Sequence, residues 1–282
     1  MTPADMDFIA QLLKRRSGLI ITSEKQYLLE SRLTPVARER GLADVTAVIA
    51  KLRTGDEALA RTVVEAMTTN ESFFFRDKTP FDQFEKVILP AMLKARAATK
   101  RLRIWCAAAS SGQEPYSLSM ILKEKGAQLA DWRIEIVGTD ISTEILARAT
   151  AGVYSQFEVQ RGLPIQLLMK YFKKEGEQWR INDELRSSIQ YRTFNLLDPF
   201  TGLGNFDIVY CRNVLIYFDE ATKRGVLTRV AQLMPADGFL LLGAAETVVG
   251  VTDVFAPMES ARGLYVKSAT AKPEAMAKIS AA

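Results

Sequence analysis

The stretch that decides the fold spans residues 102–116 and reads LRIWCAAASSGQEPY. The apolar run at 102–109 predicts a buried strand, and the serines and Gly112 that follow it predict a tight turn. Pro115 suits the first turn of a helix, so we expect the chain to continue as a helix over 115–125. A strand that passes through a short turn into a helix is typical of a parallel α/β sheet.

The same alternation continues along the chain on the carboxyl side. Further strands are predicted at 134–138, 189–194, 206–210, 239–243 and 263–266, with helices at 144–151 and 220–234. Near-continuous apolar strands separated by helices predict a largely parallel sheet that is covered on both faces.

Residues outside this alternation divide the chain further. Residues 1–70 carry apolar side chains at helical spacing and predict a small all-α domain, in which one helix begins at Thr22 or Ser23 and ends at Gly41. Shorter helical patterns follow at 45–52 and 57–67. The predicted division is a helical domain at 1–70, a linker at 71–80, an α/β domain at 81–267 and a disordered tail at 268–282.

Within the α/β domain, residues 153–188 interrupt the pattern. This segment contains Gly162, Pro164, a helical stretch at 167–172 and a short polar segment at 176–182. We interpret it as a subdomain inserted between the second and third strands of the sheet.

The composition excludes several classes of chemistry. The 282 residues include no histidine, which removes Ser-His-Asp and Cys-His hydrolases and all His-ligated metalloenzymes. The two cysteines cannot complete a Cys₄ metal site. Cys106 and Cys211 both lie in apolar runs, which predicts buried, reduced thiols in an intracellular protein.

The charge balance is mildly basic, with a net charge of +4 and a pI of about 9.0. This balance permits an acidic partner without requiring nucleic acid. The chain has no apolar run of about 18 uncharged residues, and its first residues include Asp5 and Asp7 instead of a basic stretch. We therefore expect a cytoplasmic protein that does not insert into membranes.

Polar side chains follow the predicted strands at the points where ligands bind in an open parallel sheet, beyond the carboxyl ends. The first strand leads to Gly112 and Glu114, the second to Asp140, the third to Asn195 and Leu196, and the fourth to Arg212 and Asn213. An acidic residue at the position of Asp140 can accept hydrogen bonds from ribose hydroxyls. Because Gly112 is the only glycine in its turn, a nucleoside without phosphates fits better than a dinucleotide.

The segment at 68–77, TTNESFFFRD, places three aromatic residues between polar ones just before the α/β domain. Phe73, Phe74 and Phe75 could simply attach the helical domain to the sheet. The alternative is that the segment forms a wall of the ligand pocket. Both hold if the phenylalanines pack inward while the polar residues face the ligand.

These motifs, in this order, resemble the chemotaxis receptor methyltransferases (CheR), which use S-adenosylmethionine to methylate glutamates of methyl-accepting chemotaxis receptors. The resemblance covers nearly the whole chain and implies a Rossmann-like α/β methyltransferase sheet, an N-terminal all-α domain and a small inserted β-subdomain. It also implies cofactor contacts at Asn70, Ser72, Arg76, Glu114, Asp140, Asn195, Leu196, Arg212 and Asn213. Ser72 keeps the hydroxyl of the usual threonine, whereas the sequence GAAE at 243–246 departs from the usual Gly-His-Ser-Glu.

The implied reaction is consistent with a chain that has no histidine. A glutamate carboxylate is already ionised at neutral pH, so its attack on a sulfonium methyl needs no general base. The enzyme must instead supply orientation and a dry pocket. We expect Arg76 to hold the carboxylate of the cofactor or of the incoming glutamate, and the ring of Tyr217 to stabilise the sulfonium. The alternative for Tyr217 is a half-buried packing residue.

Recognition of the receptor is expected in the helical domain, where Arg32 and Arg38 match basic residues implicated in receptor binding in the family. The alternative for both is a solvated charged surface. Some family members dock a receptor C-terminal pentapeptide on the inserted subdomain through a glycine-containing loop insertion. The segment at 171–180 is short and has no G-x-G, so we predict independence from such a peptide, and the resemblance suggests a monomer.

Two other functions compete with this interpretation. Methyltransferases that act on adenine amino groups typically carry Asp/Asn-Pro-Pro-Tyr/Phe after the fourth strand, whereas residues 211–214 here read CRNV. Nucleic acid is therefore not an expected partner. A cofactor-binding module without activity is the other alternative, and the retained Arg76, Glu114, Asp140 and Tyr217 argue against it.

Overall fold

The computed structural model describes residues 1–259 and 261–268. The chain forms two compact units. The helical unit contains Met1–Asn70 together with Tyr217–Thr222, and the sheet unit contains Glu71–Ile216 and the chain from Lys223 onward. The predicted disordered tail lies, apart from Ser268, outside the described residues.

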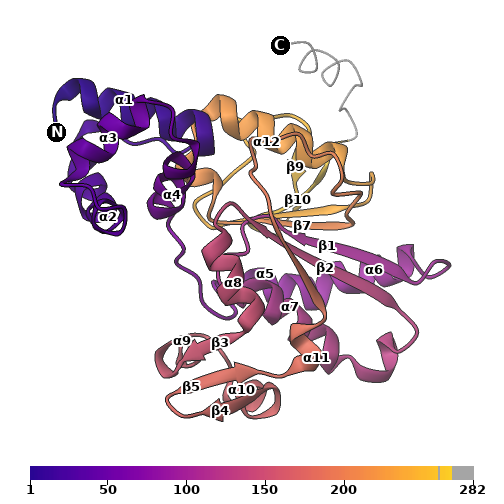
Figure 1. The fold of residues 1–282 in the computed structure, drawn as a ribbon. Helices are drawn as coiled ribbons and strands as arrows, with labels where there is room; N and C mark the ends of the chain where they lie inside the picture. Colours follow the sequence, from indigo (N-terminus) through magenta and orange to yellow (C-terminus); the bar gives the residue numbers. More distant parts are fainter. Residues whose placement is uncertain (260, 269–282) are drawn as a thin grey trace. The chain divides into compact units, whose positions relative to one another are not determined.

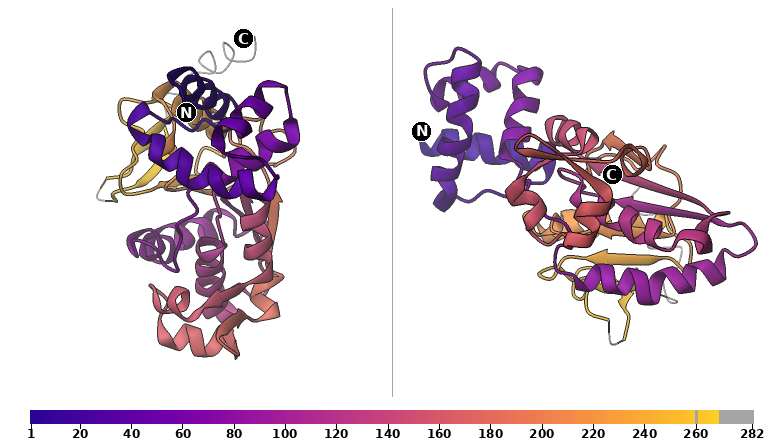
Figure 2. Two further views of the ribbon diagram at one scale, coloured as in Figure 1. Left: turned by 60° about the vertical axis from the view of Figure 1, so that its left-hand side comes forward. Right: turned by 90° about the horizontal axis from the view of Figure 1, so that it is seen from below.

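The helical unit is built from four main helices, seen in indigo and purple in Figure 2. They are α1 (Pro3–Ser17), α2 (Gln26–Glu39), α3 (Val45–Arg53) and α4 (Glu57–Met67), with a short 3₁₀ turn at Ser23–Lys25. Asp44 and Asp56 cap the N-termini of α3 and α4 because each side chain accepts a backbone N–H in the first turn. As predicted, the second helix ends just before Gly41, whose φ of +64° suits glycine.

The sheet unit contains a seven-stranded sheet with the order β6-β2-β1-β7-β8-β10-β9, most of whose strands are labelled in Figure 1. The strands are β1 (Arg101–Cys106), β2 (Arg133–Asp140), β6 (Ile189–Thr193), β7 (Ile208–Cys211), β8 (Phe239–Leu242), β9 (Phe255–Pro257) and β10 (Leu264–Lys267). The first five of these pair in parallel, as predicted, whereas β10 runs antiparallel to both β8 and β9. The next strand of this sheet along the chain, β2, lies on one side of β1, and β7 lies on the other side of β1. The strand order therefore reverses at β1.

Helices connect these strands and lie against the sheet in Figure 1. Those predicted from sequence are α7 (Gln113–Glu124), α8 (Thr143–Ala151) and α12 (Glu220–Gln232), and a 3₁₀ turn at Gly126–Leu129 follows α7. A further helix, which was not predicted from sequence, precedes β1 and consists of α5 (Thr79–Gln83), a π-helical turn (Phe84–Ile88) and α6 (Leu89–Ala95). Pro90 has no N–H to donate, so the regular hydrogen-bond ladder is interrupted next to the π-helical turn.

The segment inserted between β2 and β6 forms a separate three-stranded antiparallel sheet with the order β3-β5-β4. Its elements are β3 (Val153–Ser155), α9 (Gln156–Gln160), α10 (Ile165–Tyr171), β4 (Phe172–Glu175), β5 (Gln178–Ile181) and α11 (Asp183–Arg186). This sheet confirms the inserted β-subdomain that the family resemblance implied.

The aromatic segment before the sheet is fixed by this subdomain. Phe74 is fully buried, and its ring meets those of Tyr154 and Phe172 edge to face at centroid distances of 5.0 and 5.5 Å. A Cβ on Gly162 would lie 2.1 Å from the Phe74 carbonyl oxygen, so the backbones approach closely there. The phenylalanine packing seen here joins parts of the sheet unit, which corrects the idea that it only attaches the helical domain to the sheet.

Cys106 and Cys211 are both free and buried, on the neighbouring strands β1 and β7, which confirms the prediction that they are buried. Burial raises the pKa of both thiols well above the ordinary value. Among residues 1–259 and 261–268, no helix is long and apolar enough to span a bilayer.

Candidate functional site

The parallel strands bring most of the predicted site residues to one edge of the sheet. Because β6, β2, β1 and β7 run in the same direction, the predicted site residues that follow them all lie at their carboxyl ends. These residues are Asn195 and Leu196 after β6, Asp140 at the end of β2, the turn into α7 with Glu114, and Arg212 and Asn213 after β7.

Asp140 is buried, and its carboxylate is held by two backbone N–H groups. Oδ2 accepts from Ser110 at 2.9 Å, and Oδ1 accepts from Ser142 at 3.1 Å. The Asp140 side chain thus joins the turn after β1 to the loop after β2. A carboxylate oxygen is an acceptor for hydroxyl donors, so an aspartate at this strand end suits a ribose.

The turn after β1 depends on Gly112 for two reasons. Gly112 has a φ of +93°, which disfavours any residue with a side chain. A Cβ at this position would also lie 2.7 Å from the Tyr191 hydroxyl and 3.0 Å from the Tyr116 ring. A Cβ on Gly138 of β2 would likewise lie 2.8 Å from the ring of Tyr191. Tyr191 therefore packs across both glycines, a role that the sequence analysis did not assign.

The most buried charges of the site surround Arg212. Its Nη1 donates to Glu114 Oε2 at 2.7 Å, and its Nη2 donates to Asp77 Oδ2 at 2.7 Å and to the backbone oxygen of Arg76 at 3.0 Å. Burial raises the pKa of Glu114, although the Arg212 guanidinium opposes this shift. The Arg212 guanidinium thus has three hydrogen-bond partners that offset the cost of burying its charge.

Arg76 and Ser72 belong to the same unit and are half-buried. The Arg76 Nη1 donates to the backbone oxygen of Glu71 at 2.7 Å, and its guanidinium lies 5.5 Å from the centre of the Phe73 ring. Since a guanidinium has five N–H donors, this contact leaves Arg76 able to bind an anion as well.

The residues after β6 and β7 are fixed by local hydrogen bonds. The Asn195 side-chain oxygen accepts from the backbone N–H of Leu197 at 3.0 Å, and the carbonyl of Leu196 accepts from Arg229 on α12 at 2.7 Å. Asn213 has a φ of +57°, and its backbone N–H donates to Glu246 at 2.8 Å. Arg229 and Glu246 were not among the predicted site residues: Arg229 lies on α12, and Glu246 was noted only as part of the GAAE sequence at 243–246, in the loop after β8.

The remaining predicted residues, Asn70, Tyr217, Arg32 and Arg38, belong to the helical unit. The Tyr217 carbonyl accepts from the backbone N–H of Ile20 at 3.0 Å. Arg38 is exposed on α2.

Arg32 is instead occupied at the end of α4. Its Nη1 donates to the carbonyl oxygens of Met67 at 2.6 Å and Thr68 at 2.7 Å, and its Nη2 donates to the Thr69 hydroxyl at 3.0 Å. A cation at the C-terminus of a helix satisfies carbonyls that lack a partner within the helix. The Arg32 guanidinium therefore stabilises the chain path at the end of α4.

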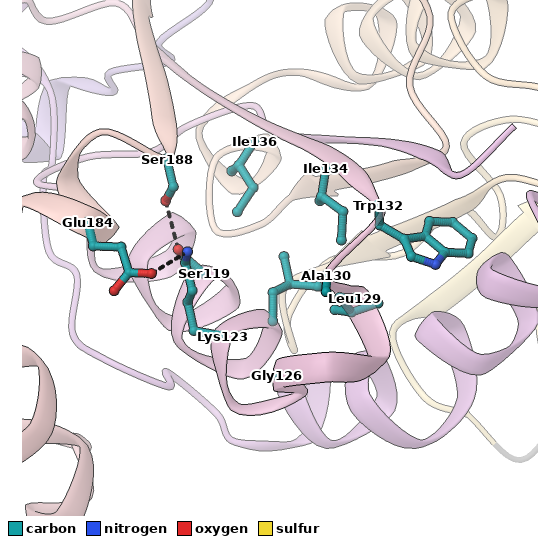
Figure 3. Close-up of a pocket in the computed structure, with 11 residues that line it drawn as sticks. Ser119, Lys123, Gly126, Leu129, Ala130, Trp132, Ile134, Ile136, Glu184 and Ser188 are labelled. Carbon is teal, nitrogen blue, oxygen red and sulfur yellow. Dashed lines mark hydrogen bonds and ion pairs between the residues drawn. The ribbon is translucent and has the colours of Figure 1, made fainter.

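One pocket of the sheet unit lies away from these residues, and another borders them. The pocket in Figure 3 is lined by Ile134 and Ile136 of β2 and by Ser119 and Lys123 of α7, and contains none of the predicted site residues. A second pocket, beside the end of β8, includes Asp77 and Glu246 among its lining residues.

The groups at the strand ends fit a nucleoside that is joined to an amino acid. The Asp140 carboxylate suits ribose hydroxyls, while Glu114 and Arg76 offer one charge of each sign for an ammonium and a carboxylate. S-adenosylmethionine has these groups. Among the described residues no cluster of side chains suits a metal ion.

Comparisons with known proteins agree with this chemistry. Residues 70–264 match the family model described as "CheR methyltransferase, SAM binding domain", and residues 4–68 match "CheR methyltransferase, all-alpha domain". "Chemotaxis protein methyltransferase 1" of Pseudomonas aeruginosa is 38% identical over 269 residues, which cover 94% of this chain and 98% of that protein. "Chemotaxis protein methyltransferase Cher2" of Pseudomonas putida is 35% identical over 275 residues, which cover 95% and 100%.

A more distant relative extends the comparison. "Chemotaxis protein methyltransferase" of Salmonella typhimurium is 32% identical over 244 residues, which cover 84% of this chain and 82% of that protein. The two family models follow one another along the chain and divide it between Thr68 and Asn70, close to the boundary between the two compact units. An all-α unit, a parallel sheet with polar strand ends and these full-length matches lead to one conclusion: the chain belongs to the CheR family of S-adenosylmethionine-dependent chemotaxis methyltransferases.

Proposed function

We propose that the protein forms methyl esters on glutamate side chains of the cytoplasmic helices of methyl-accepting chemotaxis receptors, and so mediates sensory adaptation. The observation that carries the proposal is the charged cluster of Arg212, Glu114 and Asp77 at the same sheet edge as Asp140. Membership of the CheR family supports the reaction and the substrate class. We further propose that the protein acts as a monomer in the cytoplasm.

Each residue of the sheet edge has a proposed part in binding the cofactor. Asp140 accepts hydrogen bonds from the ribose, and Asn195 and Leu196 contact the adenine. Glu114, Arg212 and Asn213 hold the amino-acid end, and Asn70 and Ser72 complete the contacts. When bound, S-adenosylmethionine supplies a methyl group that its sulfonium has already activated.

The protein is then left with the task of orientation. A glutamate carboxylate is the nucleophile without help from a base, which agrees with the absence of histidine from the sequence. Arg76 orients a carboxylate through its free N–H donors, and the Tyr217 ring stabilises positive charge. In favourable intramolecular reactions, orientation alone contributes on the order of 7–11 kcal/mol, so orientation by Arg76 can account for much of the rate.

Receptor recognition is proposed for the helical unit. Arg38 is exposed, so it can meet acidic side chains of a receptor helix, whereas Arg32 acts by holding the end of α4. The inserted subdomain joins β4 to β5 through a turn at Gly176 that carries no insertion. We therefore propose that methylation does not depend on a C-terminal receptor pentapeptide. Titration of such a peptide into the protein in a calorimeter should give no binding heat, and micromolar binding would contradict this part.

The main experiment transfers a labelled methyl group from S-adenosylmethionine to a receptor cytoplasmic fragment and then applies mild alkali. Methyl esters hydrolyse in alkali, so we expect the label to be released as volatile methanol. A receptor fragment whose methyl-accepting glutamates are changed to alanine is the matched control, and it should remain unlabelled. Label that survives alkali would indicate N-methylation and contradict the proposed ester.

A further inference from the structure

The carboxylate of Glu246 gathers four backbone N–H groups from two loops. Oε2 accepts from Gly243 at 2.6 Å and from Asn213 at 2.8 Å, while Oε1 accepts from Val214 at 2.9 Å and from Ile216 at 3.3 Å. The residue is only 9% exposed. Hydrogen bonds from backbone N–H groups to a carboxylate are charge-assisted, so they are stronger than neutral ones.

These contacts join the loop after β7 to the loop after β8. Residues 213–216 follow Arg212 directly, so the Glu246 side chain fixes the path of the chain immediately beyond the buried ion pair. Asn213 has a φ of +57°. This left-handed conformation costs free energy in a residue with a side chain, so it persists only where the surrounding structure holds the residue in place. The hydrogen bond from its N–H to Glu246 holds it there.

Gly243 is matched to this arrangement. A Cβ at position 243 would lie 2.7 Å from the Asn213 side-chain oxygen, 2.8 Å from Glu246 Oε2 and 2.9 Å from the Asn213 nitrogen. Any larger residue would push the carboxylate and Asn213 apart. By contrast, Ala244 and Ala245 between them are exposed. The spacing Gly-x-x-Glu, without the histidine that usually lies between, therefore has a physical reason of its own.

We propose that Gly243 and Glu246 form a clamp that positions Arg212 and Asn213 for the cofactor. Neither clamp residue contacts the cofactor; both are positioning residues that act through the loop after β7. The inference rests on the proposed cofactor roles of Arg212 and Asn213 and is independent of the identity of the methyl acceptor.

The test is calorimetric titration of S-adenosylhomocysteine into the full chain and its variants. Glu246→Gln keeps one acceptor oxygen but turns an NH₂ group towards two backbone N–H groups, which leaves those donors unpaired. We expect the Kd to rise about tenfold in this variant and further in Glu246→Ala, with one site per chain retained. Ala245→Ser, a change inside the same turn that does not touch the carboxylate, should bind with the parent Kd.

The stoichiometry separates positioning from folding. A variant that has only lost folded protein binds fewer equivalents with the parent Kd, and this result for Glu246→Gln would overturn the clamp. If Glu246→Gln does not fold, Glu246→Asp keeps the charge on a shorter side chain, and a parent Kd for it would likewise overturn the clamp. Asn213→Ala is titrated in the same way. If its Kd rises while Glu246→Gln keeps the parent Kd, the clamp is refuted and the cofactor role of Asn213 stands. If Asn213→Ala keeps the parent Kd, the cofactor role of Asn213 is refuted.

Discussion

Arg212 and Glu114 form an ion pair that is almost completely withdrawn from solvent. Their Nη1 and Oε2 atoms are 2.7 Å apart, and 1% and 12% of the two side chains are exposed. The second carboxylate on Arg212 comes from Asp77, whose side chain is 38% exposed. The two ion pairs of the guanidinium thus differ in how strongly water screens them.

This difference predicts unequal effects of removing each carboxylate charge. Glu114→Gln leaves a buried guanidinium without its buried counter-charge, and we expect the free energy of unfolding to fall by about 3 kcal/mol. Asp77→Asn removes the screened partner, and the expected loss is about 1 kcal/mol or less. Urea denaturation of both variants at pH 7 measures the two losses. Equal losses would show that burial of Glu114 does not decide the stability of the cluster.

A second prediction concerns pH and the helical unit. Asp219 pairs with Lys14 at 2.7 Å and accepts the backbone N–H of Thr222 at 2.8 Å. The Lys14 ammonium and the Thr222 hydroxyl and N–H lower the pKa of Asp219 well below its ordinary value. Because the folded pKa is lowered, the stability that the carboxylate contributes is present above about pH 4 and is lost as pH falls further.

Asp219→Asn tests this dependence by removing the titrating group. The urea midpoints of the parent and the variant should differ at pH 7, and the difference should shrink as pH falls below about 4. A difference that stays constant down to about pH 2 would mean that the Asp219 charge contributes nothing. Glu24→Gln, at another exposed position of the same unit, is the matched control and should follow the parent at every pH.

The sequence predicted those parts of the structure that leave a long local signal. The apolar runs that became β1, β2 and β7 are distinctive, and strand direction then brings Asp140 and Arg212 to one edge. The strands β3 and β9, of three residues each, are too short for a period of two to be visible, so residue patterns did not locate them. Only the family resemblance implied the small sheet.

The residues whose roles were not predicted make their contacts with parts of the chain that are distant in sequence. Tyr191 matters because it faces two glycines from another strand, and Glu246 because its carboxylate reaches a loop more than 30 positions earlier. Arg32 was assigned to receptor recognition because it matches basic residues implicated in receptor binding in the family. Its contact with carbonyls 35 and 36 residues later becomes visible only in three dimensions.

A third prediction concerns the glycine turn. Gly112→Ala would place a methyl group 2.7 Å from the Tyr191 hydroxyl at a φ of +93°, so strain and a clash add together. We expect a loss of about 2–4 kcal/mol in the free energy of unfolding and weaker binding of S-adenosylhomocysteine. Gly176→Ala has a φ of +61° but open space around it, so it should lose only about 1 kcal/mol and leave binding unchanged. Similar behaviour of the two variants would exclude the packing role of Tyr191.

A fourth prediction separates the two arginines of α2. Arg38→Glu changes an exposed side chain, so we expect a higher KM for the receptor with unchanged stability and cofactor affinity. Arg32→Glu removes three hydrogen bonds and sets an anion against helix carbonyls, and the expected loss is about 2–3 kcal/mol of unfolding free energy. Thermal unfolding and receptor titration distinguish the two. Unchanged stability in Arg32→Glu would contradict the role of Arg32 at the end of α4 and favour a role in receptor recognition.

A fifth prediction ranks the two proposed catalytic groups. Arg76→Ala removes the guanidinium but keeps the backbone oxygen that Arg212 Nη2 binds, so the buried ion cluster survives the substitution. We expect the rate of methyl transfer at saturating cofactor and receptor to fall about 100-fold, because a positioned donor is lost. Tyr217→Phe keeps the aromatic ring, whose face is the part that stabilises a cation, and its rate should stay within about fivefold of the parent.

Single-turnover kinetics with preloaded cofactor measure the two rates apart from cofactor binding. Lys78→Ala, an exposed cation close to Arg76 in the sequence, is the control for a general loss of positive charge and should retain the parent rate. An Arg76→Ala rate equal to that of the parent would show that Arg76 has no role in the reaction. A larger loss of rate in Tyr217→Phe than in Arg76→Ala would show that the Tyr217 hydroxyl makes the more important contact. Within residues 1–259 and 261–268 the Arg76 side chain makes one hydrogen bond, to the Glu71 backbone oxygen, so most of its donors remain for an anion. That arrangement is the physical reason to expect the guanidinium to matter more than the hydroxyl.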